Sequence, residues 1–169
     1  MSSDELINEI EILNKVANRD LPSVNFLYER FCRDSENRPF CEWCLNGWPR
    51  YMPDKESGIY FFRWPKDEVI YIGKATTANL GAEIWGKFGK PTKVENERLI
   101  FKSNKFLSNM TPELSKEPEL QNAIRQGEIF VTTVTVNPPQ ISSFIEVYLQ
   151  TVYSEKMNGN LPKLNKRIG

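Results

Sequence analysis

Two tyrosines, Tyr60 and Tyr71, belong to the triplets Gly58–Tyr60 and Tyr71–Gly73, which ten residues separate. A phenol hydroxyl donates and accepts hydrogen bonds and can transfer a proton, so the pair could orient and act on a polar substrate. Each triplet stands in a β-branched and aromatic run typical of a strand, with Pro65-Lys66 as a turn between them. A hairpin closed symmetrically about this turn would place the two tyrosines directly opposite each other, on one face.

The alternative interpretation is that both tyrosines are ordinary aromatic strand residues. For a single triplet that would be the better interpretation. Both triplets at this spacing, however, arise by chance only on the order of 10⁻⁵ times per chain of this size. The pair is therefore a specific signal.

These residues resemble the signature of the GIY-YIG nuclease superfamily, in which two such triplets are followed by a helical arginine, a metal-binding glutamate and a late asparagine. The resemblance covers about residues 57–166. It implies a small α/β (α+β) fold with a mixed, mainly antiparallel sheet and flanking helices. It also implies that the protein hydrolyses phosphodiester bonds of double-stranded DNA with the help of a metal ion.

The resemblance assigns roles to the residues of both triplets. Tyr60 would accept a proton from the attacking water or orient it, and Tyr71 would hydrogen-bond the phosphate or the water. Lys74 directly follows the second triplet, a position where lysine is common in the family. An ammonium near a phenol would lower the pKa of that phenol and help it to accept a proton. Without the resemblance, Lys74 is an exposed loop lysine.

The end of the chain is similar to the closing block of the same family. There a helical glutamate is followed by a proline and an asparagine just beyond the helix, and the matching residues are Glu146, Pro162 and Asn165. By this match, Glu146 would be the single carboxylate ligand of Mg²⁺ or Mn²⁺. Asn165 would orient backbone or help to position the phosphate. Alone, Glu146 reads as a solvated helical glutamate and Asn165 as a turn cap.

The chain departs from the family at the helical arginine. The matching position is Glu83, or Ile84 if the alignment slips by one residue. A glutamate would repel the phosphate that an arginine clamps. Lys87, one helical turn on, could supply a cation or pair with Glu83. Three explanations stay open, namely divergence with another cation substituting, an inactive domain, and an engineered charge reversal.

Composition sets wider bounds. The 169 residues suit one domain, and the 22 basic and 22 acidic residues produce no overall cationic field, although a local basic groove suffices to bind phosphates. The absence of histidine excludes histidine-dependent triads and histidine metal ligands. The N-terminus is acidic and no long apolar run occurs, so we expect a soluble, cytoplasmic protein without a membrane partner.

Three cysteines, Cys32, Cys41 and Cys44, could suggest a zinc knuckle or a redox dithiol. A zinc site needs a fourth ligand, and only Asp34 offers a makeshift one. We expect reduced thiols and no zinc.

The hydrophobic spacing predicts a first helix with Ser2 and Glu5 as a capping box. It predicts a second helix after Pro22-Ser23, with one apolar face formed by Val24, Leu27, Tyr28 and Phe31. Further on we expect a short helix after the second triplet, a helix over 117–126, a strand over 129–136 and a helix over about 140–157.

Residues 87–113 are basic and polar with interleaved aromatics, which suits contact with a DNA groove. Lys87, Lys90 and Arg98 are the candidate phosphate ligands. A charge-balanced surface is the alternative interpretation.

We expect residues 1–56 to form an N-terminal helical extension and residues 57–169 a nuclease-like domain. The extension would serve DNA contact or dimerisation, or would complete the core. The first expected function is a restriction-type DNA endonuclease, a hydrolase acting as a homodimer or a pair of monomers. One alternative is a catalytically impaired module that binds DNA or protein. The other is a structure-specific repair or recombination nuclease.

Overall fold

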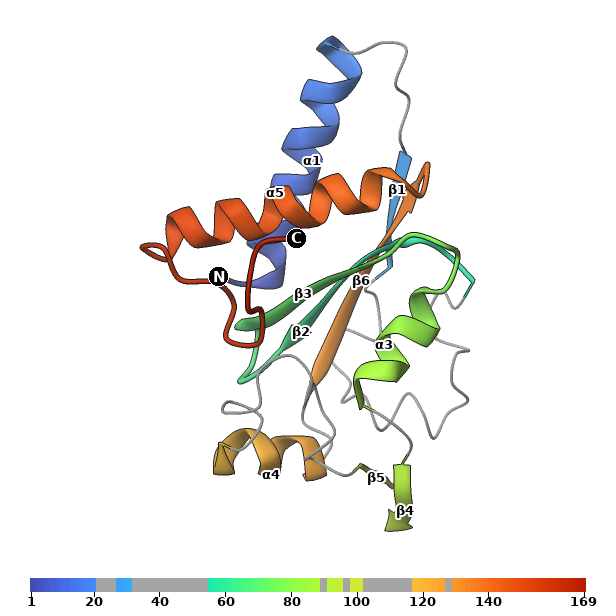
Figure 1. The fold of residues 1–169 in the computed structure, drawn as a ribbon, viewed down its shortest axis with the longest axis vertical. Coiled ribbons are helices and arrows are strands. Elements are labelled where there is room, and N and C mark those ends of the chain that lie inside the picture. Colours follow the sequence, from blue (N-terminus) through green and yellow to red (C-terminus); the bar gives the residue numbers. More distant parts are fainter. Residues whose placement is uncertain (21–26, 32–54, 89–90, 96–97, 102–116, 127–128) are drawn as a thin grey trace.

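A computed structural model of the chain describes residues 1–20, 27–31, 55–88, 91–95, 98–101, 117–126 and 129–169. In chain order its elements are α1 (Ser3–Asp20), β1 (Leu27–Phe31), β2 (Gly58–Arg63), β3 (Val69–Ala75), α3 (Leu80–Phe88), β4 (Pro91–Glu95), β5 (Arg98–Phe101), α4 (Pro118–Gln126), β6 (Phe130–Asn137) and α5 (Ile141–Lys156) (Figure 1).

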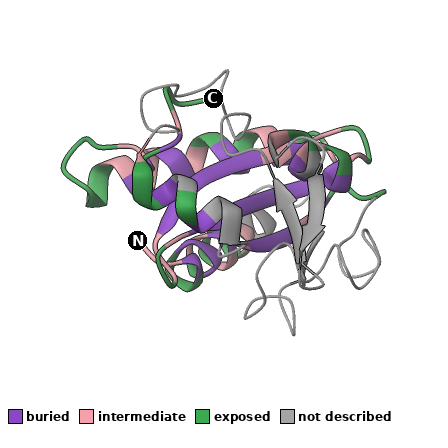
Figure 2. Ribbon diagram, turned by 90° about the horizontal axis from the view of Figure 1, so that it is seen from below, coloured by how far each residue is buried: buried purple, intermediate pink, exposed green. Residues whose placement is uncertain are grey.

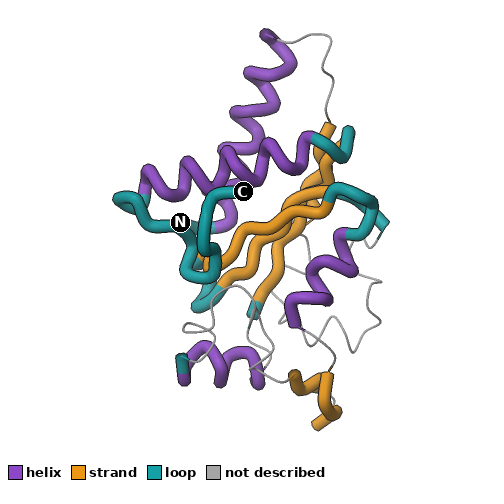
Figure 3. The backbone as a smooth tube through the Cα atoms, in the orientation of Figure 1, coloured by secondary structure: helices purple, strands orange, loops and turns teal. Residues whose placement is uncertain are grey.

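A four-stranded sheet in the order β1-β6-β2-β3 carries both triplets, and β4 and β5 form a separate two-stranded sheet. Each strand pair is antiparallel. Figure 3 shows the central strands side by side with helices around them. The predicted class, a small α+β fold with flanking helices, is therefore confirmed. The parallel pairing that a mixed sheet requires does not occur among the described strands.

The main hydrophobic core lies between the sheet and the helices α1 and α5. Successive strand residues point to opposite faces, so alternate residues of β2 turn the same way. Ile59 and Phe61 are fully buried in one cluster with Leu6 and Ile10 of α1 and Ile145 of α5. Figure 2 shows the central strands largely buried. The N-terminal helix thus shares its core with the strands that carry the triplets.

The opposite face of β2 and β3 carries the aromatic residues Tyr60, Phe62 and Tyr71, and α3 covers it. Leu80 of α3 is fully buried, and the ammonium of Lys87 on the same helix lies 5.9 Å from the ring centroid of Tyr71. The two helices α3 and α5 therefore contact the triplet strands from opposite sides.

The capping box at the start of α1 is confirmed. The backbone N–H of Ser2 donates to Oε2 of Glu5 at 2.8 Å, and the N–H of Glu5 donates to Oγ of Ser2 at 3.2 Å. The predicted short helix after the second triplet is α3, and the predicted helix over 117–126 is α4. The strand and the last helix are also confirmed, as β6 and α5. Both were predictable because the spacing of their apolar residues matches the period of the element that they form.

The second predicted helix is wrong over the residues that the structure describes. Leu27–Phe31 is strand β1, which pairs with β6 from Leu27 opposite Asn137 to Phe31 opposite Thr133. Without β1, the backbone of β6 would form an unpaired sheet edge. Leucine, tyrosine and phenylalanine suit both element types, so this long-range pairing decides the outcome. Val24 lies outside the described residues.

The predicted register of the hairpin is also wrong. Tyr60 lies opposite Gly73, and Phe62 lies opposite Tyr71. The two tyrosines are therefore diagonal neighbours rather than direct partners. Because the register is displaced by two residues, and the side-chain period of a strand is two, both phenols still share one face.

The reason for this register is the connection between β2 and β3. The N–H of Trp64 donates to the carbonyl of Glu68 at 2.8 Å, and Lys66 has a positive φ of 53°. A bulge between Phe62 and Arg63 also shifts the pairing. The loop is thus longer than the symmetric two-residue turn that we predicted.

Among the helices of the described residues, none combines the length and the apolar composition that a bilayer crossing requires. The three cysteines lie outside the described residues, so the expectation that they hold no zinc stays a prediction.

Candidate active site

The candidate site lies at the outer edge of β3, where α5 and the chain that follows it meet this strand. A pocket of about 370 Å³ opens there. It is lined by Tyr71 of β3, by Glu146 and Gln150 of α5, and by Asn165, Lys166 and Arg167 of the C-terminal segment. In Figure 1 this segment returns from the end of α5 to the first half of β3. The carboxylate of Glu146 and the phenol of Tyr71, which come from opposite faces of the sheet, thus meet around its edge.

The two tyrosine rings lie close together and almost completely out of water. Their centroids are 5.9 Å apart, and Tyr60 and Tyr71 are only 1% and 4% exposed. A hydrogen bond between their hydroxyls links the two phenols. The ring of Tyr60 crosses directly over Gly73, where a side chain would collide with it. The glycine of the second triplet thus allows the tyrosine of the first to reach the site.

Burial keeps both phenols neutral. It raises the pKa of Tyr71 to about 12, and the nearby negative charges of Glu146 and Glu83 act in the same direction. Burial likewise raises the pKa of Tyr60 well above its usual value. The predicted lowering of a phenol pKa by Lys74 is therefore wrong, because desolvation dominates and Lys74 pairs elsewhere. A neutral phenol can orient a water or a phosphate oxygen but is a poor proton acceptor at neutral pH.

Alkaline titration tests this environment. The pKa of Tyr71 is about 12 in the folded chain but near 10 when unfolded. The folded state therefore binds this proton more tightly, which adds to the free energy of unfolding below about pH 10. That stability should be lost as the pH rises from about 10 to 12. We expect the urea midpoint of the wild type to fall more steeply over this range than that of Tyr71→Phe. Equal slopes would contradict the raised pKa.

Glu146 forms an ion pair with Lys74 across the edge of the sheet. Nζ of Lys74 lies 2.7 Å from Oε2 of Glu146. The glutamate is 7% exposed, whereas the lysine side chain is 32% exposed. Apart from this ion pair, Oε2 has no hydrogen-bond partner among the described residues. A buried carboxylate needs a compensating charge, and the ammonium of Lys74 supplies it.

The donor set of the pocket fits a hydrated hard cation. Mg²⁺ is commonly bound by one or two carboxylates, with waters and substrate oxygens as the other ligands. Glu146 offers one buried carboxylate, whose Oε2 is paired only with the ammonium of Lys74, in a pocket with room for waters. The described residues contain no cluster of three or more acidic, cysteine or histidine side chains that would form a closed site. Glu146 is therefore the residue that could hold such an ion.

Asn165 contacts the backbone of β3 with both ends of its amide. Its Oδ1 accepts from the N–H of Ile72 at 2.9 Å, and its Nδ2 donates to the carbonyl of Ile72 at 2.9 Å. The side chain thus pairs with the strand edge as a further strand would. Of the two predicted roles, orienting backbone is the one that this geometry supports. The amide nitrogen has a second N–H, so the predicted contact with a phosphate stays a prediction.

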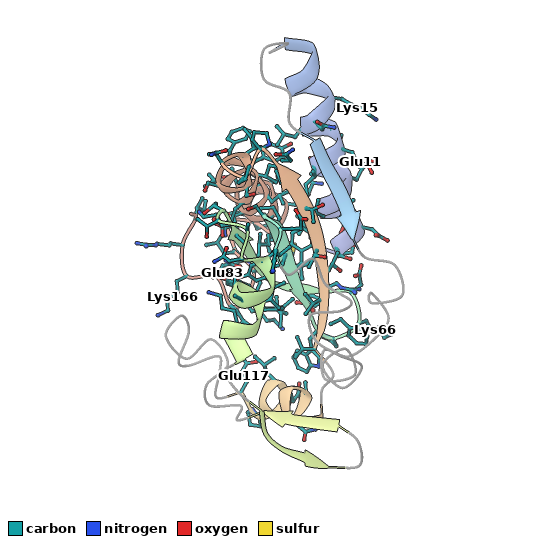
Figure 4. The ribbon with its side chains drawn as sticks, turned by 90° about the vertical axis from the view of Figure 1, so that its right-hand side faces the viewer. Glu11, Lys15, Lys66, Glu83, Glu117 and Lys166 are labelled. Carbon is teal, nitrogen blue, oxygen red and sulfur yellow. The ribbon has the colours of Figure 1, made fainter. Side chains whose placement is uncertain are left out.

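Glu83, the residue that the resemblance aligns with an arginine, lies near the phenols. It is half-buried on α3, its Oε1 accepts a hydrogen bond from Nδ2 of Asn79 at 3.1 Å, and its charge raises the pKa of both tyrosines. Figure 4 shows Glu83 projecting from α3 and Lys166 from the C-terminal segment. The negative charge of Glu83 thus acts on both phenols, although Glu83 is not among the residues that line the pocket.

Of the three candidate phosphate ligands, Lys87 is near the site, with its ammonium over the ring of Tyr71. Lys90 lies outside the described residues, and only the backbone of Arg98, in β5, is described.

Sequence reasoning missed four residues of the pocket, Gln150, Lys166, Arg167 and Gly169. Gln150 stands four residues after Glu146, which places both on one face of a helix, so the spacing could have revealed it. Lys166 and Arg167 form a basic pair directly after Asn165, a weaker signal.

Comparisons of the chain with models of protein families, with characterised proteins and with solved structures found no match.

Proposed function

We propose that the protein is a metal-dependent endonuclease with a GIY-YIG fold that hydrolyses phosphodiester bonds of duplex DNA. One observation carries the proposal. The buried carboxylate of Glu146 and the phenol of Tyr71, 75 residues apart in the chain, line a single pocket. The lysine that follows the second triplet contacts the same carboxylate at 2.7 Å. Buried groups of this kind, gathered in a pocket, are a typical feature of active sites.

The two phenols would position the reacting groups. In the folded protein both are neutral, so each hydroxyl keeps a proton that it can donate in a hydrogen bond. Tyr71 lines the pocket, and Tyr60, which is not among the lining residues, is hydrogen-bonded to Tyr71. Tyr71 would contact the phosphate or the attacking water, and Tyr60 would fix the orientation of the Tyr71 hydroxyl. Fixed donors aimed at a reacting group lower the barrier because they need no reorganisation during the reaction.

Glu146 would hold the metal ion, Mg²⁺ or Mn²⁺. When bound, such an ion supplies a positive charge that stabilises the leaving oxygen of the phosphodiester. Without a metal ion, Lys74 compensates the charge of Glu146, with its Nζ 2.7 Å from Oε2. Since its side chain is 32% exposed, Lys74 can turn from the carboxylate toward an entering phosphate.

A second candidate function is supported by Glu83. Its carboxylate lies close enough to raise the pKa of both phenols, at the place where the family has an arginine. A negative charge there opposes the approach of a phosphate. The protein could therefore be an impaired member that binds duplex DNA without cutting it.

Cleavage of a supercoiled plasmid separates the two functions. We expect the wild type to nick or linearise the plasmid with Mg²⁺ or Mn²⁺, and not in EDTA. Duplex binding should weaken as the salt concentration rises, because phosphate contacts release counterions. If the protein binds duplex DNA in this salt-dependent way but cuts none with either metal, the binding module is the better description. A preference for branched DNA would indicate a structure-specific repair enzyme, and one fixed sequence a restriction enzyme.

Replacing Glu83 should raise the cleavage rate. Glu83→Gln can keep the bond to Asn79 while it removes the negative charge, and Glu83→Arg adds the cation that the family uses. We expect a gain of about tenfold for Glu83→Gln, and of about 10²-fold for Glu83→Arg, the usual effect of one charged group at a transition state. Single-turnover cleavage rates measure both. Glu117→Gln, at the half-buried residue just before the helix α4, is a control away from the pocket. If both Glu83 variants cut no faster than this control, Glu83 does not oppose catalysis.

A further inference from the structure

The C-terminal segment Asn165–Gly169 is attached to the site at both of its ends. Asn165 makes its two 2.9 Å hydrogen bonds to the backbone of Ile72. At the other end, the N–H of Gly169 donates to Oε1 of Gln150 at 2.8 Å. Gln150 itself is 1% exposed and donates to the carbonyl of Ile72 at 3.4 Å. A short segment held at two points has few conformations left, so the residues between them are held at the pocket.

Lys166 and Arg167 lie between these two attachments, and both line the pocket with Glu146 and Tyr71. Their side chains are exposed, whereas Glu146 is buried. The pocket thus has a carboxylate inside and two cations at its rim. A phosphate of a large substrate enters such a pocket from the solvent side, where the cations are.

Two cations outside the C-terminal segment, Lys74 and Lys87, also lie near the site. Lys74 pairs with Glu146 at 2.7 Å, and the ammonium of Lys87 lies over the ring of Tyr71 at 5.9 Å. A guanidinium also differs from an ammonium, because its planar fork binds two oxygens of one phosphate at once. Among the residues that line the pocket, Arg167 is the guanidinium.

We propose that the attached segment Asn165–Gly169 is a permanent wall of the pocket, and that Arg167 binds the substrate phosphate there. The helix α3 contains no arginine that could do so. The inference rests on the proposed function, and it names the phosphate ligand of that same site. Glu83 repels the phosphate on the side of α3, and Arg167 attracts it from the C-terminal side.

Three variants of the full chain test this role. Arg167→Ala removes the guanidinium, and Arg167→Lys keeps the charge without the fork. Lys163→Ala is a matched control, because Lys163 belongs to the same part of the chain but reaches Glu68, at 3.7 Å, and does not line the pocket. We expect Arg167→Ala to lower the single-turnover cleavage rate about 10²–10³-fold. Arg167→Lys should recover part of the rate, and Lys163→Ala should stay within about twofold of the wild type.

A second measurement does not depend on cleavage. Inorganic phosphate is titrated into ¹⁵N-labelled protein, and the amide signal of Gly169 is followed. We expect saturable shifts in the wild type and in Lys163→Ala, and a half-saturation concentration at least about tenfold higher in Arg167→Ala, as expected when a charged hydrogen bond is lost.

The outcomes separate this inference from the proposed function. If the wild type cuts DNA and Arg167→Ala cuts as fast as Lys163→Ala, the role of Arg167 is overturned and the nuclease stands. If the wild type cuts no DNA but binds phosphate through Arg167, the nuclease is overturned and the phosphate site stands. If phosphate shifts nothing in the wild type and Arg167→Ala changes no rate, the inference is overturned.

Discussion

Replacing Glu146 by glutamine should lower Mg²⁺-dependent cleavage of duplex DNA by about 10³-fold. This factor corresponds to the several kcal/mol of transition-state stabilisation that a bound metal supplies. Glu146 has the one buried carboxylate of the pocket, and glutamine has nearly the same shape without the charge. The loss should persist when Mg²⁺ is raised or replaced by Mn²⁺. Single-turnover cleavage of a short duplex measures it.

The fold should tolerate this substitution. Glu146→Gln leaves Lys74 without its partner, but that side chain is 32% exposed and its ammonium can reach water. Glu155→Gln, on the exposed face of the same helix α5, is the matched control. Circular dichroism should show both variants folded. Mn²⁺ binding, followed by electron paramagnetic resonance, should weaken only in Glu146→Gln. Cleavage at the wild-type rate by Glu146→Gln would rule out the proposed role of this carboxylate.

Replacing Gly73 by alanine should destabilise the protein by about 3 kcal/mol, the upper range for an overpacked core. A Cβ at this position would lie 2.5 Å from Cζ and 2.6 Å from the hydroxyl oxygen of Tyr60, and 2.7 Å from Cε1 of Tyr71. Both rings are buried and cannot simply turn away. The phenols must then leave their positions, so cleavage should fall together with the free energy of unfolding. Urea denaturation and the plasmid assay measure the two effects.

Gly86→Ala is the matched control, because it adds the same methyl group at another glycine. Gly86 lies on α3, and nothing is within 4 Å of the position that its Cβ would take. Alanine in an exposed helix position stabilises by about 0.5–1 kcal/mol relative to glycine. The two substitutions should therefore change the free energy of unfolding in opposite directions. If Gly73→Ala is as stable as the wild type, the close packing of Tyr60 over Gly73 is not present in solution.

Elements whose signal is local could be predicted. The capping box of Ser2 and Glu5 joins residues three positions apart, and the helix α5 repeats its apolar residues at helical spacing. The alternation along β6 likewise needs no information from elsewhere in the chain. In each case the periodicity of the side chains agrees with the surface on which the element packs.

Pairings that depend on distant residues could not be predicted. β1 is a strand because β6, about a hundred residues later, offers it a backbone edge. The hairpin register depends on the bulge at Phe62 and Arg63 and on the loop that follows. Lys74 contacts Glu146 rather than a phenol because α5 brings a buried carboxylate within 2.7 Å of it.

By itself, the sequence determined which residue types the site could contain, since two tyrosines, a lysine and a glutamate come from elements that form through local periodicity. Only the tertiary structure decided how those groups are charged and which others join them. Burial raises the pKa of both phenols, and the attachment of Asn165 and Gly169 brings Arg167 to the pocket. Solvent exclusion and long-range contacts exist only in the assembled chain, so a linear pattern does not contain them.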